Sequence, residues 1–411
     1  MSRILTAPRE ARALMAPLAR GDLDDERALR MFAAATWSCI VEPGDSVAGR
    51  LVAALGHEAA LGEVSGGGRD GLAREAAAIS AGAWQQARDR WLPRLDGEVV
   101  RDALQRAARA GIALVTHEDP AWPAAVDDLG EHRPLVLWVR GDVGALGGCT
   151  PSSAHSVALV GARAATSYGE HVSMELSADL VGRGMTIVSG AAYGIDGAAH
   201  RAALTSGGTT VALLAGGADR PYPSGHAQLI ERIAASGAVV SEVPCGSPPT
   251  KWRFLQRNRL IAALAGATVV VEAGARSGSL NTAGHAAALA RPLGAVPGPV
   301  TSAASAGCHR LLREFDARCV TNADEVMELL GAAPPALFDM PSGGHGDRTD
   351  DTTRVRDAMS FRSWRQTADI ARRSGLSSTD VTGILGLMAL EGEAVRGDGG
   401  WRRVRTETPV H

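Results

Sequence analysis

The residues best suited to chemistry in this sequence lie in the run KWRFLQRNR, residues 251–259, which holds four cations and two aromatic rings. Its Lys251 is the single lysine among the 42 basic residues of the chain. Cations beside rings suit single-stranded nucleic acid, because the cations meet phosphates and the rings stack on bases. A competing interpretation makes Phe254 a core residue and places the arginines on a solvated helix face.

Three more segments rich in Gly, Ser and Arg follow apolar runs, at residues 161–163, 189–197 and 276–280. Glycine lets a ligand approach the backbone, and the N–H groups at the start of a following helix attract anions. We expect Asp196 to cap the helix that follows the second segment. That segment is not GxGxxG, and the acidic residue of a ribose site is missing, so a dinucleotide site has little support.

Catalytic and metal-binding patterns are weak. Ser189, Asp196 and His200 could suggest a hydrolase triad, but no GxSxG elbow surrounds Ser189 and no base is placed to activate it. The 11 His residues form no HExxH pattern, and the five Cys residues form no CxxC. We therefore expect no metal, no cofactor and no enzymatic activity.

The elements that must position these residues repeat along the middle of the chain. Apolar runs alternate there with helix-length stretches such as 169–183 and 196–206, a pattern typical of a parallel sheet buried on both faces. In such sheets the carboxyl ends of the strands form the ligand crevice. The runs begin near Val157, Thr186, Thr209, Ala238, Thr268 and Leu293.

The patterns divide the chain into four parts. Residues 1–150 predict a small helical domain, with strand-like lead-in runs at its end. Residues 151–331 predict an extended Rossmann-like α/β domain. Residues 332–352, rich in Pro, Gly and Asp, predict a flexible linker. Residues 353–411 show two helical patterns and a hairpin on a GDGG turn, the layout of a winged helix.

Periodicity and charge refine this division. The expected helices of the first part are 28–40, 47–55 and 72–92, and those of the last part are 366–373 and 379–390. The chain has 411 residues and a formal net charge of −3, so any nucleic-acid site must be a local basic feature. From Asp351 onward there are 10 basic and 8 acidic residues, a nearly balanced tail.

The cysteine usage and the N-terminus bear on location. Scattered cysteines without a disulfide framework fit a reducing cytoplasm. The first 15 residues lack the apolar region of a signal peptide, and no run approaches the roughly 18 apolar residues of a membrane span. We expect a cytoplasmic protein without a membrane partner.

Taken in series, the motifs resemble the DNA-processing family called DprA or Smf. The similarity covers about 170 residues and includes lead-in runs at 116–120 and 134–141. The motifs are VALVGAR at 157–163, SG with GID and AH between 189 and 200, RNR at 257–259, SGSL at 277–280 and VPG at 296–298.

The resemblance implies an extended Rossmann fold that binds single-stranded DNA without cutting it. The family protects incoming strands in natural transformation and loads the RecA recombinase onto strands coated by single-strand-binding protein. It also implies a homodimer, a helical, sterile-alpha-like (SAM-like) domain before the sheet and a winged-helix domain after it. By this resemblance the DNA-binding residues are Gly161, Arg163, Ser189, Gly190, Lys251, Phe254, Arg257, Asn258, Arg259, Ser277, Gly278 and Ser279.

Three departures from the family pattern bear on the affinity for DNA. Ala162 replaces the usual Ser, Tyr193 stands where many members have Arg or Lys, and Leu255-Gln256 replaces a frequent Pro-containing step before Arg257. The alternative function is a Rossmann protein that binds or processes a nucleotide, either as an enzyme or as a sensor acting through the winged helix. The enzyme would require an acidic cluster with PGGxGT, which this sequence lacks.

Overall fold

The computed structural model describes residues 7–66, 72–149, 155–331 and 351–404. The chain divides into two units, Met1–Pro335 and Ala336–His411, each with its own apolar core. Residues 332–350, almost all of the expected linker, lie outside the described residues.

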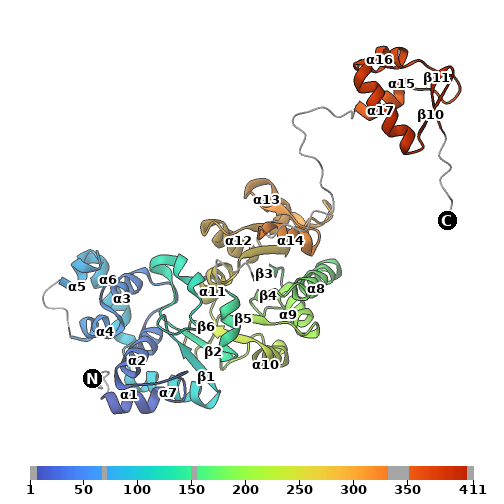
Figure 1. The fold of residues 1–411 in the computed structure, drawn as a ribbon. Coiled ribbons are helices and arrows are strands. Elements are labelled where there is room, and N and C mark those ends of the chain that lie inside the picture. Colours follow the sequence, from blue (N-terminus) through green and yellow to red (C-terminus); the bar gives the residue numbers. More distant parts are fainter. Residues whose placement is uncertain (1–6, 67–71, 150–154, 332–350, 405–411) are drawn as a thin grey trace. The chain divides into compact units, whose positions relative to one another are not determined.

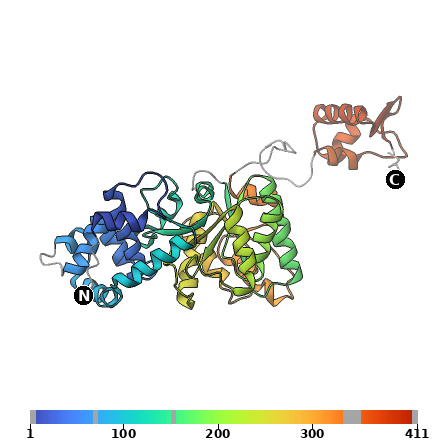
Figure 2. The same ribbon diagram turned by 90° about the horizontal axis from the view of Figure 1, so that it is seen from below.

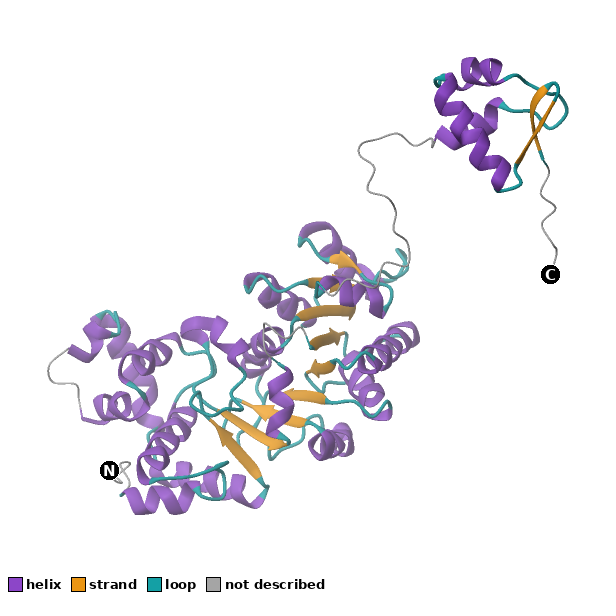
Figure 3. Cartoon of the chain, in the orientation of Figure 1, coloured by secondary structure: helices purple, strands orange, loops and turns teal. Residues whose placement is uncertain are grey.

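The larger unit is built on a nine-stranded sheet with the order β1-β2-β6-β5-β4-β3-β7-β8-β9 (Figure 1 and Figure 3). In this sheet order, all strands between β6 and β9, including β5, β4, β3, β7 and β8, are parallel to one another. Strand β2 is antiparallel to both of its neighbours. The strands are β1 (Ile112–Val115), β2 (Leu137–Gly141), β3 (Ser156–Gly161), β4 (Thr186–Ser189), β5 (Thr210–Leu214), β6 (Ala238–Ser241), β7 (Ala267–Glu272), β8 (Leu293–Ala295) and β9 (Arg318–Cys319).

Helices cover both faces of the parallel part, as the expected α/β fold requires. In β3, Val157 and Leu159 join the core on one face, while Ala158 and Val160 join the core on the other. The first face is covered by α8 (Ser167–Gly182), α9 (Ile195–Thr205), α10 (Ala227–Ser236) and α14 (Ala323–Leu329); the second by α11 (Lys251–Leu264), α12 (Ser279–Ala288) and α13 (Ala306–Glu314).

All six apolar runs expected as strands of the parallel sheet are strands, β3 to β8. The further parallel strand β9 was not predicted, because its two residues are polar or exposed and lack an apolar pattern. The chain order changes direction between β3 and β7: β4, β5 and β6 extend the sheet on one side, and β8 and β9 on the other. This reversal is where ligands bind in open α/β sheets.

The N-terminal helices gather beside β1 and β2 (Figure 2), and the two lead-in strands belong to the main sheet. Trp138 of β2 and Leu114 of β1 pack among residues of α1, α2 and α7. The domain boundary at residue 150 stays a prediction. The helices are α1 (Pro8–Met15), α2 (Asp25–Ile40), α3 (Ser46–Leu55), α4 (His57–Gly66), α5 (Leu72–Ala76), α6 (Ala81–Trp91) and α7 (Gly97–Arg109).

The expected helix 72–92 is instead two helices, α5 and α6. The helix is interrupted between them, where Ala78 has a φ of 51°, and the Ser80 hydroxyl caps α6. The described part of the larger unit also holds five 3₁₀ segments: η1 (Leu92–Arg94), η2 (Ala124–His132), η3 (Val143–Gly148), η4 (Ser224–His226) and η5 (Ala303–Ser305).

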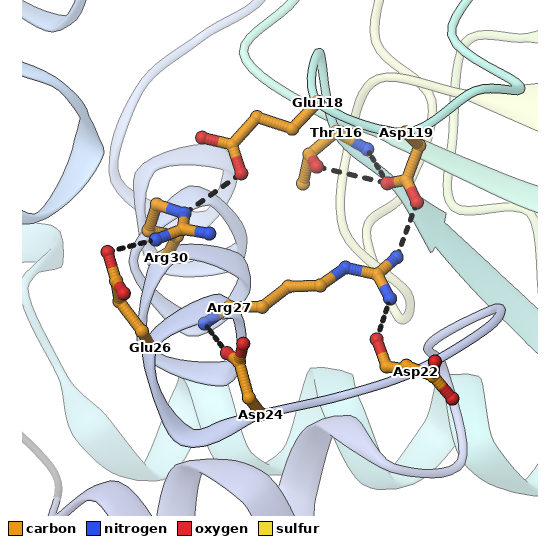
Figure 4. Close-up of polar contacts among 8 residues, drawn as sticks. All are labelled: Asp22, Asp24, Glu26, Arg27, Arg30, Thr116, Glu118 and Asp119. Atoms are coloured by element: carbon orange, nitrogen blue, oxygen red, sulfur yellow. Dashed lines mark hydrogen bonds and ion pairs between the residues drawn. The ribbon is translucent and has the colours of Figure 1, made fainter.

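A polar connection joins α2 to the loop after β1 (Figure 4). The Arg27 guanidinium lies 2.6 Å from the Asp119 carboxylate, which also accepts hydrogen bonds from the backbone N–H and the hydroxyl of Thr116. Arg30 lies 2.9 Å from Glu118 in the same loop. Since Asp119 is buried, its charge needs these donors. The connection fixes the helical region against the sheet.

The smaller unit consists of α15 (Asp351–Ala358), α16 (Thr367–Ser374), α17 (Ser378–Leu390) and the hairpin β10 (Ala394–Gly397) with β11 (Gly400–Arg403). The expected two helices and hairpin are present, and α15 is an additional helix. The winged-helix assignment itself stays a prediction. Within the described residues, no helix combines the length and the apolar character that a membrane crossing requires.

A close backbone approach makes a glycine of α3 necessary. A Cβ added at Gly49 would lie 2.0 Å from the Glu131 carbonyl oxygen of η2. We expect Gly49→Ala to lower the melting temperature, because the clash is with a backbone atom and should cost toward the upper end of about 1–3 kcal/mol, which exceeds the gain of about 1 kcal/mol in helix propensity. Gly62→Ala in α4 is the matched control, since nothing lies within 4 Å of its added Cβ. Equal melting of the two variants would contradict the prediction.

Candidate nucleic-acid interface

A cleft of about 810 Å³ opens where the sheet changes direction, between the ends of β3 and β7. Its walls come from five segments: residues 161–164 after β3, Ala192 and Asp196 after β4, Tyr222 after β5, the first turns of α11, and residues 274–279 after β7. The cleft therefore lies at the carboxyl edge of the sheet, as the sequence predicted.

Phe254 on α11 lies at the centre of a cluster of rings and guanidinium groups in this cleft. The Arg163 guanidinium lies over the ring at 4.7 Å from its centroid, and that of Arg257 at 5.8 Å. The ring centroid of Tyr222 is 5.6 Å from that of Phe254. Phe254 is half-buried, so the ring is held in place but still reachable from the cleft.

Positive charge dominates the cleft. Among its lining residues four are cations, and Asp196 is the one acid. Low-dielectric walls strengthen the field of such a group of like charges and attract anions. The cations are Arg163, Lys251, Arg257 and Arg276.

Asp196 and Arg257 are both buried below this cluster. Burial raises the pKa of Asp196, and the nearby Arg257 opposes that shift. Burial likewise lowers the pKa of Arg257 to about 10, with Asp196 opposing, so the guanidinium stays charged at neutral pH. Its Nη1 donates to the Leu213 carbonyl of β5 at 2.7 Å. Arg257 thus contributes a fixed charge to the cleft.

The expectation that Asp196 caps α9 is wrong. The N-cap residue is Gly194, which makes no side-chain capping bond. Asp196 lies in the first helical turn and accepts hydrogen bonds from the backbone N–H groups of Gly190 and Ala192, at 3.2 and 3.4 Å. Its role is to shape the loop between β4 and α9.

The loop after β3 is held by Glu272, a buried residue at the end of β7. Its carboxylate accepts hydrogen bonds from the backbone N–H of Thr166 at 2.8 Å and from its hydroxyl at 2.7 Å. Its carbonyl accepts from the N–H of Ala162 at 2.7 Å. A Cβ on Gly161 would lie 2.5 Å from Ile195, so this close crossing requires glycine. These contacts position Arg163 over the cleft.

The loop after β7 supplies two hydroxyls to the cleft. The hydroxyls of Ser277 and Ser279 lie 2.7 Å apart, on either side of Gly278. Asn258 of α11 donates to the Gly278 carbonyl at 3.4 Å and to Asn281 at 3.2 Å. Asn258 therefore ties α11 to the start of α12.

Nine of the twelve candidate residues line the cleft, and three do not. Ser189 is fully buried and donates to the Leu159 carbonyl at 2.6 Å. Gly190 lies against Arg257, whose Nη1 would be 1.9 Å from an added Cβ. Arg259 donates to both oxygens of Glu242 at 2.7 Å and is 3% exposed. These three residues hold the framework behind the cleft.

The sequence did not single out Tyr222 or Glu272. Tyr222 lies in a loop that carries no motif, and Glu272 reads as an ordinary strand end. The one sequence feature that could have indicated both was their place at the carboxyl edge of the parallel sheet, since Tyr222 follows β5 and Glu272 ends β7. Arg276 was part of a suggested anion segment, and the structure places it at the cleft wall.

Ser189, Asp196 and His200 do not form a triad. His200 is fully buried, its Nδ1 lies 2.7 Å from the Thr210 hydroxyl, and burial lowers its pKa to about 3. The Ser189 hydroxyl is committed to a carbonyl oxygen, as described above. Within the described ranges, no group of three or more His, Cys, Asp or Glu side chains is arranged to hold a metal ion.

Comparison with known proteins identifies a family that matches the part of the chain holding the cleft. Residues 113–331 match the family described as DNA recombination-mediator protein A. A DNA-processing protein, DprA, of Mycobacterium tuberculosis is 48% identical over 316 residues, which span 74% of this chain and 80% of the relative. The DNA processing protein DprA of Bacillus subtilis is 33% identical over 219 residues, 53% of this chain and 70% of the relative.

A solved structure agrees with the fold. The crystal structure of DNA processing protein A from Streptococcus pneumoniae superposes with a TM-score of 0.57 and 26% sequence identity. The match covers 73% of this chain and 97% of that one.

Phe254 provides a test of stacking that is independent of charge. If a base stacks on this ring, Phe254→Ala should weaken single-strand binding roughly 5- to 150-fold, the equivalent of about 1–3 kcal/mol. The salt dependence should not change, because no charge is removed. Fluorescence anisotropy with a labelled single strand at several salt concentrations measures both quantities.

Trp252→Ala is the matched control, because Trp252 is on the same helix, is 55% exposed and does not line the cleft. It should leave the affinity unchanged. A melting curve separates binding from folding, since loss of a core ring costs about 3–5 kcal/mol. The stacking role is excluded if Phe254→Ala binds normally or melts far below the parent protein.

Proposed function

This chain belongs to the DNA recombination-mediator protein A family, a family of DNA-processing proteins, and we propose that it binds single-stranded DNA in the cleft between β3 and β7. The observation that carries the proposal is the Phe254 ring set among four cations in a cleft with one acid. A flexible strand offers this site both phosphates and unstacked bases.

In the proposed complex, the cleft residues have distinct tasks. Arg163, Lys251 and Arg276 neutralise phosphates, since all three are exposed at the cleft. Arg257 adds a fixed charge beneath the ring, and a base stacks on the cluster around Phe254. The hydroxyls of Ser277 and Ser279 each form one hydrogen bond with the sugar–phosphate backbone of the DNA. Phosphate contacts and stacking carry little sequence information, so binding should be nearly independent of sequence.

We further propose a non-enzymatic, cytoplasmic recombination mediator that protects incoming strands and loads the RecA recombinase in natural transformation. The support is the family membership together with the motif resemblance. A homodimer and a contact with single-strand-binding protein belong to the same proposal. In this proposal, binding of the strand in the cleft is the first step of the sequence of events.

The exposed cations carry a quantitative prediction. Arg163→Ala and Lys251→Ala should each weaken binding to all single-strand sequences alike. Each lost phosphate contact should reduce the slope of log affinity against log salt by about 0.7. Titrations of two unrelated sequences across a range of salt concentrations measure the effect. A variant with unchanged affinity and slope would remove that residue from the proposed site.

Two controls accompany this measurement. Arg232→Ala removes an exposed cation of α10 that does not line the cleft, and should have little effect. Competition with nucleoside mono- and triphosphates tests the nucleotide-binding alternative. A free nucleotide that displaces the strand at micromolar concentration would favour a sensor or enzyme over a strand-binding mediator.

The division into two units predicts that the tail is dispensable for capture of the strand. A chain ending at Gly331 retains every residue that lines the cleft. It should keep single-strand affinity within roughly tenfold, about 1.4 kcal/mol, of the full chain. Side-by-side titrations of the two proteins with one labelled single strand test this. A larger loss would move the principal single-strand site into the tail.

A further inference from the structure

Tyr193 is an exposed aromatic ring beside the cleft, and it is not one of the residues that line the cleft. It follows β4 in the loop that also supplies Ala192 to the cleft wall, so it lies at the same carboxyl edge of the sheet. Its side chain is 46% exposed. Its hydroxyl makes no hydrogen bond with any described residue. The ring is therefore accessible to a ligand.

The Tyr193 ring is held in place by the residues next to it. It packs edge-to-face against the buried His226, with 4.7 Å between the ring centroids. The Nδ1 atom of His226 lies 3.0 Å from the carbonyl oxygen of Ala191, which fixes the imidazole. A Cβ added to Gly225 would lie 2.5 Å from the Tyr193 hydroxyl, so the ring closely covers this glycine. A ring that is already fixed loses little freedom when a ligand binds to it.

Tyr222 connects this ring to the ring of the cleft. The centroids of Tyr222 and Phe254 are 5.6 Å apart. Tyr222 also lies three residues before Gly225, the glycine that Tyr193 covers, and three residues of chain span at most about 11 Å. Between them, Ser224 and Gly225 are exposed and small. A flexible chain that leaves the cleft past Tyr222 can therefore reach Tyr193 without meeting a bulky side chain in this segment.

Two cations without acidic partners lie near Tyr193. A Cβ added to the residue after it would lie 2.6 Å from the carbonyl oxygen of Arg163, whose guanidinium lies over the cleft ring. A Cβ added to Gly197 on α9 would lie 2.5 Å from His226 and 3.1 Å from the Arg201 guanidinium, so Arg201 lies beside the histidine that supports the ring. Both arginines are exposed, and within the described part of the chain neither forms an ion pair.

From this arrangement we propose that Tyr193 is a second stacking position for the single strand, taken by a base further along the strand than the one on Phe254. Arg201 contacts a phosphate beside that base. The inference rests on the proposed binding of the strand in the cleft and extends its path along the sheet edge. Rings beside cations suit a flexible strand, and any base can stack because every base has a π face.

The length of the strand separates the two stacking positions, because a strand must extend beyond the cleft to reach Tyr193. The test measures the affinity of the full chain for labelled oligothymidylates of increasing length by fluorescence anisotropy. Tyr193→Ala should weaken the binding of long strands roughly 5- to 150-fold. It should not change the affinity for the shortest strand that binds. The salt slope should also stay the same, because no charge is removed.

Three further variants identify the group responsible. Tyr193→Phe keeps the ring and should bind strands of every length like the parent protein. Arg201→Ala should reduce the salt slope by about 0.7 for long strands only. Tyr168→Ala is the matched control, because Tyr168 on α8 is a tyrosine of similar exposure, 42%, that does not line the cleft. It should leave the affinity unchanged at every length.

The second stacking position is excluded if Tyr193→Ala binds long strands normally, loses the same factor at every length, or loses no more than Tyr168→Ala. If Tyr193→Ala melts below the parent protein, Tyr193→Leu takes its place, since leucine keeps the apolar bulk without a flat face. Such a failure leaves the effect of Phe254→Ala untouched. Failure of the cleft proposal would instead appear as normal binding of the shortest strands by Phe254→Ala and Lys251→Ala.

Discussion

The cleft depends on one buried charge, the guanidinium of Arg257. It donates to the carbonyl at the end of β5, lies near the buried Asp196, and has the Phe254 ring 5.8 Å away. A buried guanidinium without partners costs several kcal/mol, so these groups must meet in one arrangement. That requirement fixes α11 against the sheet and the loop after β4 against α11. These fixed elements then hold the exposed residues Arg163 and Lys251 at the cleft.

Gly190, which lies next to Arg257, shows that this constraint also limits which residues the sequence can hold. Any side chain at Gly190 would meet the Arg257 guanidinium, since an added Cβ would lie 1.9 Å from Nη1. The SG pair at the end of β4 is therefore needed for packing under the cleft. The sequence motif correctly indicated that this position matters, but its direct contact would be with an arginine and not with a phosphate. Short motifs locate a site more reliably than they assign roles within it.

Much of the fold could be predicted from the sequence, because it depends on local patterns. Continuous apolar runs alternating with helices predicted β3 to β8, and the carboxyl edge of that sheet predicted the location of the cleft. The strand β9 and the break between α5 and α6 were missed. A two-residue strand has no periodicity to detect, and the break at Ala78, where φ is positive, carries no Gly or Pro signal in the sequence.

The site was harder to predict, since its chemistry depends on which charges find partners. In the run 251–259, Arg253 binds Glu42 and Arg259 binds Glu242, whereas Lys251 faces the cleft. Glu42 lies 211 residues from Arg253, so no local pattern could have identified the pair. The rings differ in the same way: Phe254 lines the cleft, while the more exposed Trp252 does not.

The same pairing rule explains how a chain with a net charge of −3 presents two basic surfaces. Salt screens exposed charges beyond about 10 Å, so a phosphate responds to the few groups nearest to it and not to the total. In the larger unit, carboxylates neutralise the arginines that face the helical region and leave the cleft cationic. In the smaller unit they pair with the arginines of α15 and α16, whereas Arg396, Arg402 and Arg403 of the hairpin form no ion pair among the described residues. In both places the unpaired guanidinium groups pack on aromatic rings, which holds a cation at the surface without cancelling its charge. A cation that packs on a ring at the surface, as Arg163 does, keeps its charge for a polyanion, whereas Arg253 and Arg259 are paired with carboxylates and mainly hold the fold.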